Sequence, residues 1–319
     1  MTSTAYLRIE SSRDAALSAN QLLDSAYAKI TGGRVAEGVD ELVIGLQNLR
    51  ESLSPEQWQH FAQHQAIQHP ITDIVHADPF TRRSFNKPRG YPGDAGILDL
   101  IYGVVPVPSG TTAIGAQVYG YTRSAPACAS VRARRDIIAE MVDGLADRVE
   151  RPKILSVAAG HLREAQRSAA AAAGRIGAWY ALDHDAESLA LIDREHVGLG
   201  VTTINNSVRG LVTGKVTLPE LDLAYAAGLY DYLALPVATA VTRALLGMVK
   251  AGGRVLVANF APNLRDIAYM ESYMAWNLIY RDEAGMKAIA DGLPQAHVKS
   301  VRLFRDQPEN IVYLEVTKR

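Results

Sequence analysis

The stretch of residues 153–164, KILSVAAGHLRE, is the feature that most constrains the fold of this chain. Its first half is apolar and uncharged after the leading lysine, which suits a strand buried on both faces of a parallel sheet. Ala158, Ala159 and Gly160 then allow a tight turn, and a helix is expected to begin near His161. A strand, a small-residue turn and a helix N-terminus together form a cradle for a nucleotide-type ligand. The same turn is also compatible with a role in packing alone.

Apolar runs typical of strands recur through the second half of the chain. The expected strands span residues 154–157, 176–182, 201–205, 221–226, 254–260, 299–304 and 310–316. Helical runs separate the first five, which predicts right-handed crossovers and a parallel arrangement. The last two are joined by a short turn at residues 306–309 and predict a hairpin. The expected fold is therefore α/β, with a doubly wound, mostly parallel seven-stranded sheet.

The first third of the chain is predicted to be helical. Apolar residues recur at steps of three and four over residues 14–30, beginning with Ala15 and Ala16, and a second helix is expected from about Val35 to Leu49. Ser54 followed by Pro55 resembles a helix N-cap with proline at the first helical position. We expect residues 1–125 to form a helical lid and substrate-binding subdomain, and residues 126–319 to form the sheet domain.

Residues 78–102, DPFTRRSFNKPRGYPGDAGILDLIY, are rich in proline, glycine and charge. They predict an irregular segment that ends in a helix from Ala95 to Tyr102, followed later by a long helix from about Ala127 to Val149. Irregular segments of this kind are often lids or binding loops, although a plain connection is the alternative. We expect residues 82–94 to form a lid over bound ligand, with Tyr91 and Asp94 facing the ligand.

Composition excludes several classes of function. Lys and Arg number 33 against 34 Asp and Glu, a net charge of -1, so no global field favours nucleic acid or anionic lipid. The single cysteine, Cys128, cannot form an internal disulfide, and no Cys/His cluster has metal-ligand spacing, so no metal is expected. His60, His64 and His69 are interpreted as solvated helix residues. No signal peptide or membrane span is expected, which favours a cytoplasmic enzyme or binding protein.

Polar and small residues follow the predicted strands where ligands of open α/β sheets bind. Asp183, after the second strand, is placed to accept hydrogen bonds from both hydroxyls of a ribose, with His184 beside it. Asp185 is the alternative, although it also suits a helix N-cap. The other expected ligand contacts are Asn206, Ser207 and Val208, which are placed to contact adenine, and the small residues Ala226, Ala227 and Gly228. A dinucleotide-binding fold shares this geometry, but the first turn lacks G-x-G-x-x-G.

Several segments carry a family resemblance. The sequences FNKPRGYPGDAGILDLIY, LDLAYAAGLYDYL, GGRVLVANFAP and YMESYMAWNLIYR resemble bacterial methyltransferases grouped with the extracellular-factor protein that makes 3-hydroxypalmitic acid methyl ester. Indole C3-methyltransferases of actinobacteria are relatives of this kind. The resemblance covers roughly residues 75–319 and implies a class I methyltransferase fold. It also implies S-adenosyl-L-methionine as cofactor, S-adenosyl-L-homocysteine as product and no metal. Such enzymes usually carry more glycine in the first loop, where this chain has Ala158 and Ala159.

An aromatic series indicates how an acceptor could be bound. Tyr269, Tyr273, Trp276 and Tyr280 are spaced four, three and four apart, which predicts one face of a helix that either packs in the core or walls an apolar pocket. Tyr225 is a further expected substrate contact.

The resemblance favours an indole-type carbon of a tryptophan-derived natural product as the methyl acceptor. Tyr91, near Arg89, and Tyr280, beside Arg281, are the candidate general bases, because a neighbouring cation lowers the pKa of a phenol. The alternative is a hydroxy-fatty-acid carboxylate, which Arg82, Arg89 or Arg281 could pair. A non-catalytic sensor that binds the cofactor is a third interpretation. A homodimer is compatible with the sequence, and the oligomeric state stays open.

Overall fold

The computed structural model describes residues 18–319, which pack as two compact units. The N-terminal unit contains the described residues through Ala129 together with Leu264–Asn277, and the sheet unit contains Ser130–Asn263 and Leu278–Arg319. The expected boundary at 125/126 lies near this division, but residues 264–277 were expected in the sheet domain and pack with the N-terminal unit instead. Ala15 and Ala16 of the first predicted helix lie outside the described residues, and helix is present over residues 18–31.

The N-terminal unit is helical, as expected. Its further elements are α2 (Val35–Ser52), α3 (Pro55–His60), a π-helical turn (Phe61–Gln65), α4 (Ala66–Gln68), α5 (Ile71–Val75), α6 (Pro79–Asn86), α7 (Ala95–Tyr102), α8 (Ala113–Ser124) and α14 (Ile267–Tyr273). Apolar side chains at helical spacing, such as Leu23, Leu42 and Ile97, are fully buried and form its core. The predicted N-cap at Ser54 is confirmed, because Ser54 and Gln57 exchange hydrogen bonds in a capping box.

The prediction of irregular backbone from residue 78 onward is wrong for the first part of this segment. Residues 79–86 form α6, because Asp78 caps its N-terminus with bonds from the Phe80 and Thr81 amides. Pro79 occupies the first helical position, where its missing N–H costs no hydrogen bond. Irregular backbone is therefore confined to residues 87–94, and the predicted helix Ala95–Tyr102 is confirmed.

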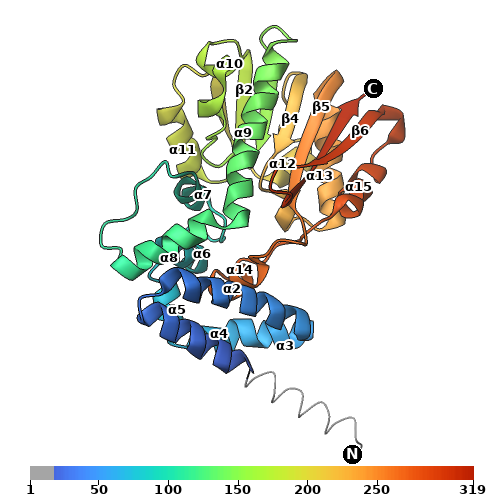
Figure 1. The fold of residues 1–319 in the computed structure, drawn as a ribbon. Coiled ribbons are helices and arrows are strands. Elements are labelled where there is room, and N and C mark those ends of the chain that lie inside the picture. Colours follow the sequence, from blue (N-terminus) through green and yellow to red (C-terminus); the bar gives the residue numbers. More distant parts are fainter. Residues whose placement is uncertain (1–17) are drawn as a thin grey trace, which may run out of the picture. The chain divides into compact units, whose positions relative to one another are not determined.

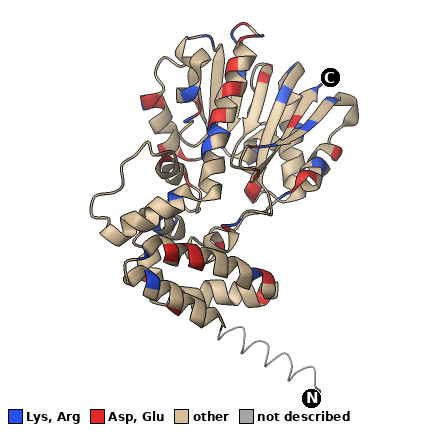
Figure 2. Ribbon diagram, in the orientation of Figure 1, with Lys and Arg blue, Asp and Glu red and all other residues tan. Residues whose placement is uncertain are grey.

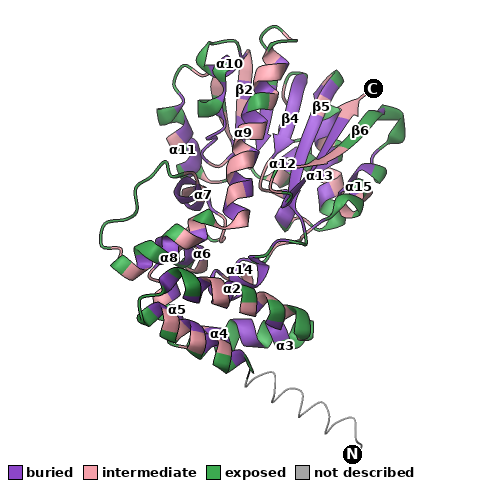
Figure 3. Ribbon diagram, viewed as in Figure 1, coloured by how far each residue is buried: buried purple, intermediate pink, exposed green. Residues whose placement is uncertain are grey.

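The sheet unit holds a seven-stranded sheet in the order β3-β2-β1-β4-β5-β7-β6 (Figure 1). The strands are β1 (Lys153–Val157), β2 (Ala178–Asp183), β3 (Val201–Asn205), β4 (Leu221–Ala226), β5 (Val249–Phe260), β6 (Val298–Arg305) and β7 (Ile311–Lys318). The first five pair in parallel, whereas β7 pairs antiparallel with β5 and β6. The predicted doubly wound sheet and terminal hairpin are confirmed. β1 and β4 are buried almost throughout, as Figure 3 shows for the centre of this sheet.

The helices that alternate with the strands along the chain cover the sheet. They are α9 (Pro126–Ala146), α10 (Ala169–Ala172), α11 (Ala186–Glu195), α12 (Val208–Val212), α13 (Leu235–Met248) and α15 (Glu283–Asp291). The helix expected near His161 is wrong: after the turn that follows β1, only a 3-10 turn at Ala165–Arg167 precedes the short α10. Acidic and basic residues are intermixed in both units (Figure 2). In the part of the chain that is described, no helix is long and apolar enough to cross a membrane.

The helix expected over the aromatic series is also wrong. α14 ends at Tyr273, and Ala275 takes the left-handed conformation with φ +47°. Beyond it, the backbone bonds to the sheet unit rather than to itself. The Ile279 amide donates to the Asp231 carbonyl at 2.7 Å, and the Arg281 amide donates to the Phe260 carbonyl at 2.9 Å. Tyr280 therefore does not share a helical face with Tyr269 and Tyr273.

Candidate functional site

The turn after β1 is conformationally strained. Ala158, Gly160 and Leu162 have φ values of +53°, +55° and +49°, in the left-handed region that favours glycine. A left-handed alanine or leucine costs on the order of 1–2 kcal/mol, so the surrounding structure must impose this conformation. The Ala159 amide bonds to the Leu182 carbonyl at 3.1 Å, and the Gly160 amide bonds to Asp183 Oδ2 at 2.8 Å. The end of β2 thus holds the turn in place.

Asp183 joins two loops at the carboxyl edge of the sheet. Its side chain is nearly buried; Oδ2 accepts from Gly160, and Oδ1 accepts from the Asp185 amide at 2.9 Å. His184 Nδ1 lies 3.3 Å from Oδ1, with its ring largely exposed. Each carboxylate oxygen has two lone pairs, so Asp183 keeps acceptor capacity for a ligand.

Asp185 has a different role from Asp183. Its carboxylate caps α11, accepting from the Glu187 amide at 3.0 Å and from the Ser188 hydroxyl at 2.7 Å. The helix cap expected as one of its two roles is therefore present.

The loop after β3 lies next to Asp183. The Asn206 amide donates to the Asp183 carbonyl at 3.0 Å, and Asn206 Oδ1 accepts from the Ser207 amide at 2.9 Å. A Cβ on Gly210 would lie 2.1 Å from Asn206 Oδ1, so a larger residue at this position would displace the Asn206 side chain. Ser207 is exposed and Val208, at the start of α12, is half-buried. In the sheet order β3 lies next to β2, and Asp183 at the end of β2 binds the turn at residues 158–160.

The loop after β4 is open at Ala227 and Gly228. Ala226 is buried, whereas Ala227 and Gly228 are half-buried. The Ala227 carbonyl accepts a hydrogen bond of 2.6 Å from Arg134 Nη1, on α9. Because β4 pairs with β1, this loop and the turn after β1 lie at the same edge of the sheet.

A buried polar network lies at β1, β2 and β4. The Tyr225 hydroxyl donates to Glu164 Oε1 at 2.6 Å and accepts from Trp179 Nε1 at 3.2 Å. Burial raises the pKa of Glu164 despite the Tyr225 hydrogen bond, and it raises the pKa of Tyr225 well above its ordinary value. The hydroxyl of Tyr225, an expected substrate contact, is therefore hydrogen-bonded within the protein.

Arg281 is fixed by neighbouring backbone. Its Nη1 donates to the Tyr230 carbonyl at 2.8 Å and to Asn259 Oδ1 at 2.6 Å, and its Nη2 donates to the Leu233 carbonyl. Burial raises the pKa of the nearby Asp231 to about 6, opposed by the Phe260 amide and by the charges of Arg134 and Arg281. Arg281 thus secures the chain after β4, and the adjacent Tyr280 is half-buried.

The remaining predicted site residues lie in the N-terminal unit. Asp94 caps α7 through the Ile97 amide and is bound by Arg83, whose Nε and Nη2 lie 2.9 and 2.8 Å from the two carboxylate oxygens. This pair anchors the end of the irregular segment that holds the half-buried Arg89 and Tyr91.

Tyr273 and Trp276 are buried in the core of the N-terminal unit. The Tyr273 hydroxyl has no hydrogen-bond partner within the described residues, and burial raises its pKa. The neighbouring Tyr269 hydroxyl lies 3.0 Å from the Thr81 hydroxyl. These aromatic rings therefore form part of the core of the N-terminal unit. Core packing was one of the two interpretations of the aromatic series.

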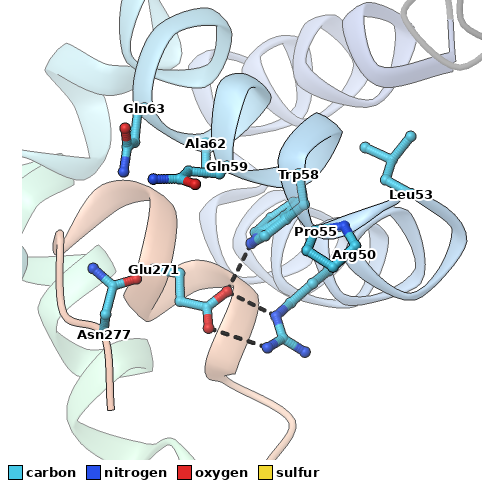
Figure 4. Close-up of a pocket in the computed structure, with 9 residues that line it drawn as sticks. All are labelled: Arg50, Leu53, Pro55, Trp58, Gln59, Ala62, Gln63, Glu271 and Asn277. Carbon is cyan, nitrogen blue, oxygen red and sulfur yellow. Dashed lines mark hydrogen bonds and ion pairs between the residues drawn. The ribbon is translucent and has the colours of Figure 1, made fainter. Parts of the chain in front are cut away.

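A pocket of about 450 Å³ lies in the N-terminal unit. Figure 4 shows the residues that line it. Glu271 accepts from Arg50 Nε and Nη2 at 2.7 and 3.1 Å and from Trp58 Nε1 at 2.7 Å. The amide side chains of Gln59, Gln63 and Asn277 also line it. The charges of Arg50 and Glu271 balance, so the pocket offers amides rather than a net charge. None of the site residues predicted from the sequence lines it.

The structure also brings forward Arg134, Glu164 and Asp231, which the sequence did not indicate. Arg134 belongs to the run RARRD on a helix, which is typical of a solvated face, and Glu164 follows a turn whose path was not expected. No group of three or more His, Cys, Asp or Glu residues suited to a metal occurs among residues 18–319.

The sheet order, with five parallel strands followed by an antiparallel hairpin, decides the fold. It is the class I methyltransferase fold. No protein-family model and no curated protein matches the sequence.

Solved structures are similar to this chain at low identity. A possible exported protein from Bordetella parapertussis matches 100% of this chain and 99% of its own, with 15% identity and a TM-score of 0.55. Magnesium protoporphyrin IX methyltransferase from Synechocystis PCC 6803, with bound S-adenosylhomocysteine, matches 74% of this chain and 100% of its own, with 13% identity and a TM-score of 0.48. The N-methyltransferase NodS from Bradyrhizobium japonicum WM9 matches 58% and 85%, with 9% identity and a TM-score of 0.42. Likeness at these identities shows the fold alone.

Proposed function

We propose that this chain is an S-adenosylmethionine-dependent methyltransferase that acts on a small, largely apolar metabolite. The observation that carries the proposal is Asp183, which binds the strained turn after β1 and still has free lone pairs at the carboxyl edge of the sheet. Strained backbone persists where function requires a particular shape. This fold binds ligands at that same edge.

The residues at this edge suit each part of the cofactor. Asp183 would accept hydrogen bonds from the ribose hydroxyls, with His184 beside it. The loop from Asn206 to Val208 would contact the adenine, and the turns 158–160 and 226–228 would contact the amino-acid part. When bound, the cofactor supplies an electrophilic methyl group on a sulfonium. The proposal includes no metal.

For the acceptor we propose an indole-type carbon, on the strength of the sequence resemblance. Methylation at a neutral carbon requires a group that holds or removes the ring N–H proton as positive charge develops. Tyr91, near Arg89, and Tyr280, beside the secured Arg281, are the two alternative candidates for this base. Ester formation on a hydroxy-fatty-acid carboxylate is the second acceptor class. The proposal places the enzyme in the cytoplasm, without nucleic-acid or membrane partners.

Mass spectrometry tests the reaction. The purified protein is incubated with cofactor that carries a deuterated methyl group and with a panel of indoles and hydroxy fatty acids. We expect a labelled methyl adduct on an indole carbon and an equal amount of S-adenosylhomocysteine. A labelled methyl ester would move the proposal to the second acceptor class, and a cofactor that binds without any transfer would favour a sensor.

The two tyrosines are tested in the same assay. Tyr91→Phe and Tyr280→Phe keep ring packing and delete the hydroxyl, and loss of a positioned general base slows turnover by ~10²- to 10⁴-fold. We expect that decrease in one of the two variants, with cofactor affinity unchanged. Wild-type turnover in both would exclude the two hydroxyls as bases.

A further inference from the structure

Arg134 is a buried cation with few partners. It lies on α9 with only 5% of its surface exposed, and its Nη1 donates to the Ala227 carbonyl at 2.6 Å. Within the described residues it forms no ion pair and no other hydrogen bond. A guanidinium has five N–H donors, and a buried charge without a partner is costly. The remaining donors of Arg134 therefore call for an anion.

The nearest carboxylates do not supply that anion. Glu164 and Asp231 act on Arg134 through space, but neither is in ion-pair contact with it. Glu164 is engaged by the Tyr225 hydroxyl and Asp231 by the Phe260 amide. Burial raises the pKa of both carboxyls and so favours their neutral, protonated form over the charged form that would pair with Arg134.

The guanidinium borders the open loop after β4. A Cβ on Gly228 would lie 3.4 Å from Arg134 Nη2 and 3.7 Å from Nη1. Because residue 228 is glycine, no side chain covers this edge of the guanidinium. The loop is half-buried and lies next to the turn after β1, where the amino-acid part of the cofactor is proposed to bind.

We propose that Arg134 pairs with the α-carboxylate of S-adenosylmethionine and S-adenosylhomocysteine. This assignment rests on the proposed function. The α-carboxylate is the one anion of these molecules, and the planar fork of an arginine matches a carboxylate with two parallel hydrogen bonds. Arg134 is thus a binding residue that selects ligands with an intact amino-acid end.

Calorimetry on the wild-type protein gives the first test. The ligands are S-adenosylhomocysteine, its decarboxylated analogue, which keeps the amine, and 5′-methylthioadenosine, which lacks the whole amino-acid end. We expect removal of the carboxylate to weaken binding by about ten- to a hundred-fold, the usual effect of a lost charge-assisted hydrogen bond. Equal affinity for the first two ligands would overturn the assignment without any variant. Failure of all three ligands to bind would overturn the proposed function, and the assignment with it.

Variants then identify the residue. Arg134→Met should reduce affinity for S-adenosylhomocysteine by about ten- to a hundred-fold and leave affinity for 5′-methylthioadenosine within about three-fold. Arg134→Lys keeps the positive charge, so its affinity for S-adenosylhomocysteine should fall less than that of Arg134→Met. Arg148→Met removes an exposed charge just beyond the same helix and should change neither affinity. A parallel decrease for both ligands in Arg134→Met would show that Arg134 only supports the loop, and would overturn the assignment.

Discussion

Arg134 in the sheet unit differs in its partners from two arginines of the N-terminal unit. In the N-terminal unit, Arg83 binds both oxygens of Asp94, and Arg50 binds both oxygens of Glu271. In the sheet unit, Arg134 is more deeply buried than either and bonds one carbonyl. A paired charge has little capacity left for a ligand, whereas a buried charge without an ionic partner can bind one. The difference supports our proposal that the ligand binds at the strand ends of the sheet unit.

The largest effect is expected from breaking a satisfied pair. Asp94→Ala removes the cap of α7 and leaves Arg83 without its carboxylate. We expect the free energy of unfolding to fall by about 2–4 kcal/mol, since both a cap and a largely buried pair are lost. Urea denaturation followed by circular dichroism measures this change.

An exposed pair provides the control. Arg305 Nε lies 2.6 Å from Glu283 Oε1, but the two side chains are 25% and 48% exposed. Glu283→Gln should cost less than about 1 kcal/mol, as exposed ion pairs do. If Asp94→Ala and Glu283→Gln lowered the free energy of unfolding equally, the buried pair of Asp94 would not be more important for stability than the exposed pair of Glu283.

Asp231 in the sheet unit is expected to make the stability of the protein depend on pH. Burial raises its pKa from 3.8 to about 6, so between these values the folded state binds more protons than the unfolded state. The free energy of unfolding should therefore decrease as the pH rises from about 4 to 6, by on the order of 3 kcal/mol from this group. Asparagine at position 231 does not titrate. The free energy of unfolding of Asp231→Asn, relative to that of the wild type, should therefore rise by the same amount over this pH range. Denaturation at pH 4, 5, 6 and 7 tests this, and a constant difference between the two proteins would contradict it.

A smaller effect is expected from the strained turn. Ala158→Gly relieves a left-handed alanine and should raise the free energy of unfolding by about 1 kcal/mol. Ala159, the next residue, does not have a positive φ, so Ala159→Gly should lower it by about 0.5–1 kcal/mol. The same sign in both variants would show that strain at Ala158 does not contribute.

Sequence periodicity predicted the sheet because strand burial is a local pattern. The apolar runs at β1 and β4 and the short turn before β7 appear in the structure near the expected residues. The tight turn after β1 was predicted, but its left-handed backbone and the absence of a helix at His161 were not. Alanine and leucine rarely adopt positive φ, and the contacts with Leu182 and Asp183 impose this path.

Tertiary hydrogen bonds explain the other error. The spacing of Tyr273, Trp276 and Tyr280 suits a helix, but the sheet unit takes the backbone groups of residues 279 and 281. Arg134 could not be recognised for a related reason. Its burial depends on the packing of α9, which the pattern of one helix does not reveal.

The central claim is that Asp183 forms part of a cofactor site, and calorimetry with S-adenosylhomocysteine tests it most directly. Asp183→Asn keeps the side-chain shape but loses the carboxylate charge, so we expect affinity to fall by about ten- to a hundred-fold. Asp185→Asn is the matched control, because Asp185 caps α11, and it should stay within about three-fold of wild type. Unchanged affinity in Asp183→Asn, or a larger loss in Asp185→Asn, would contradict the account.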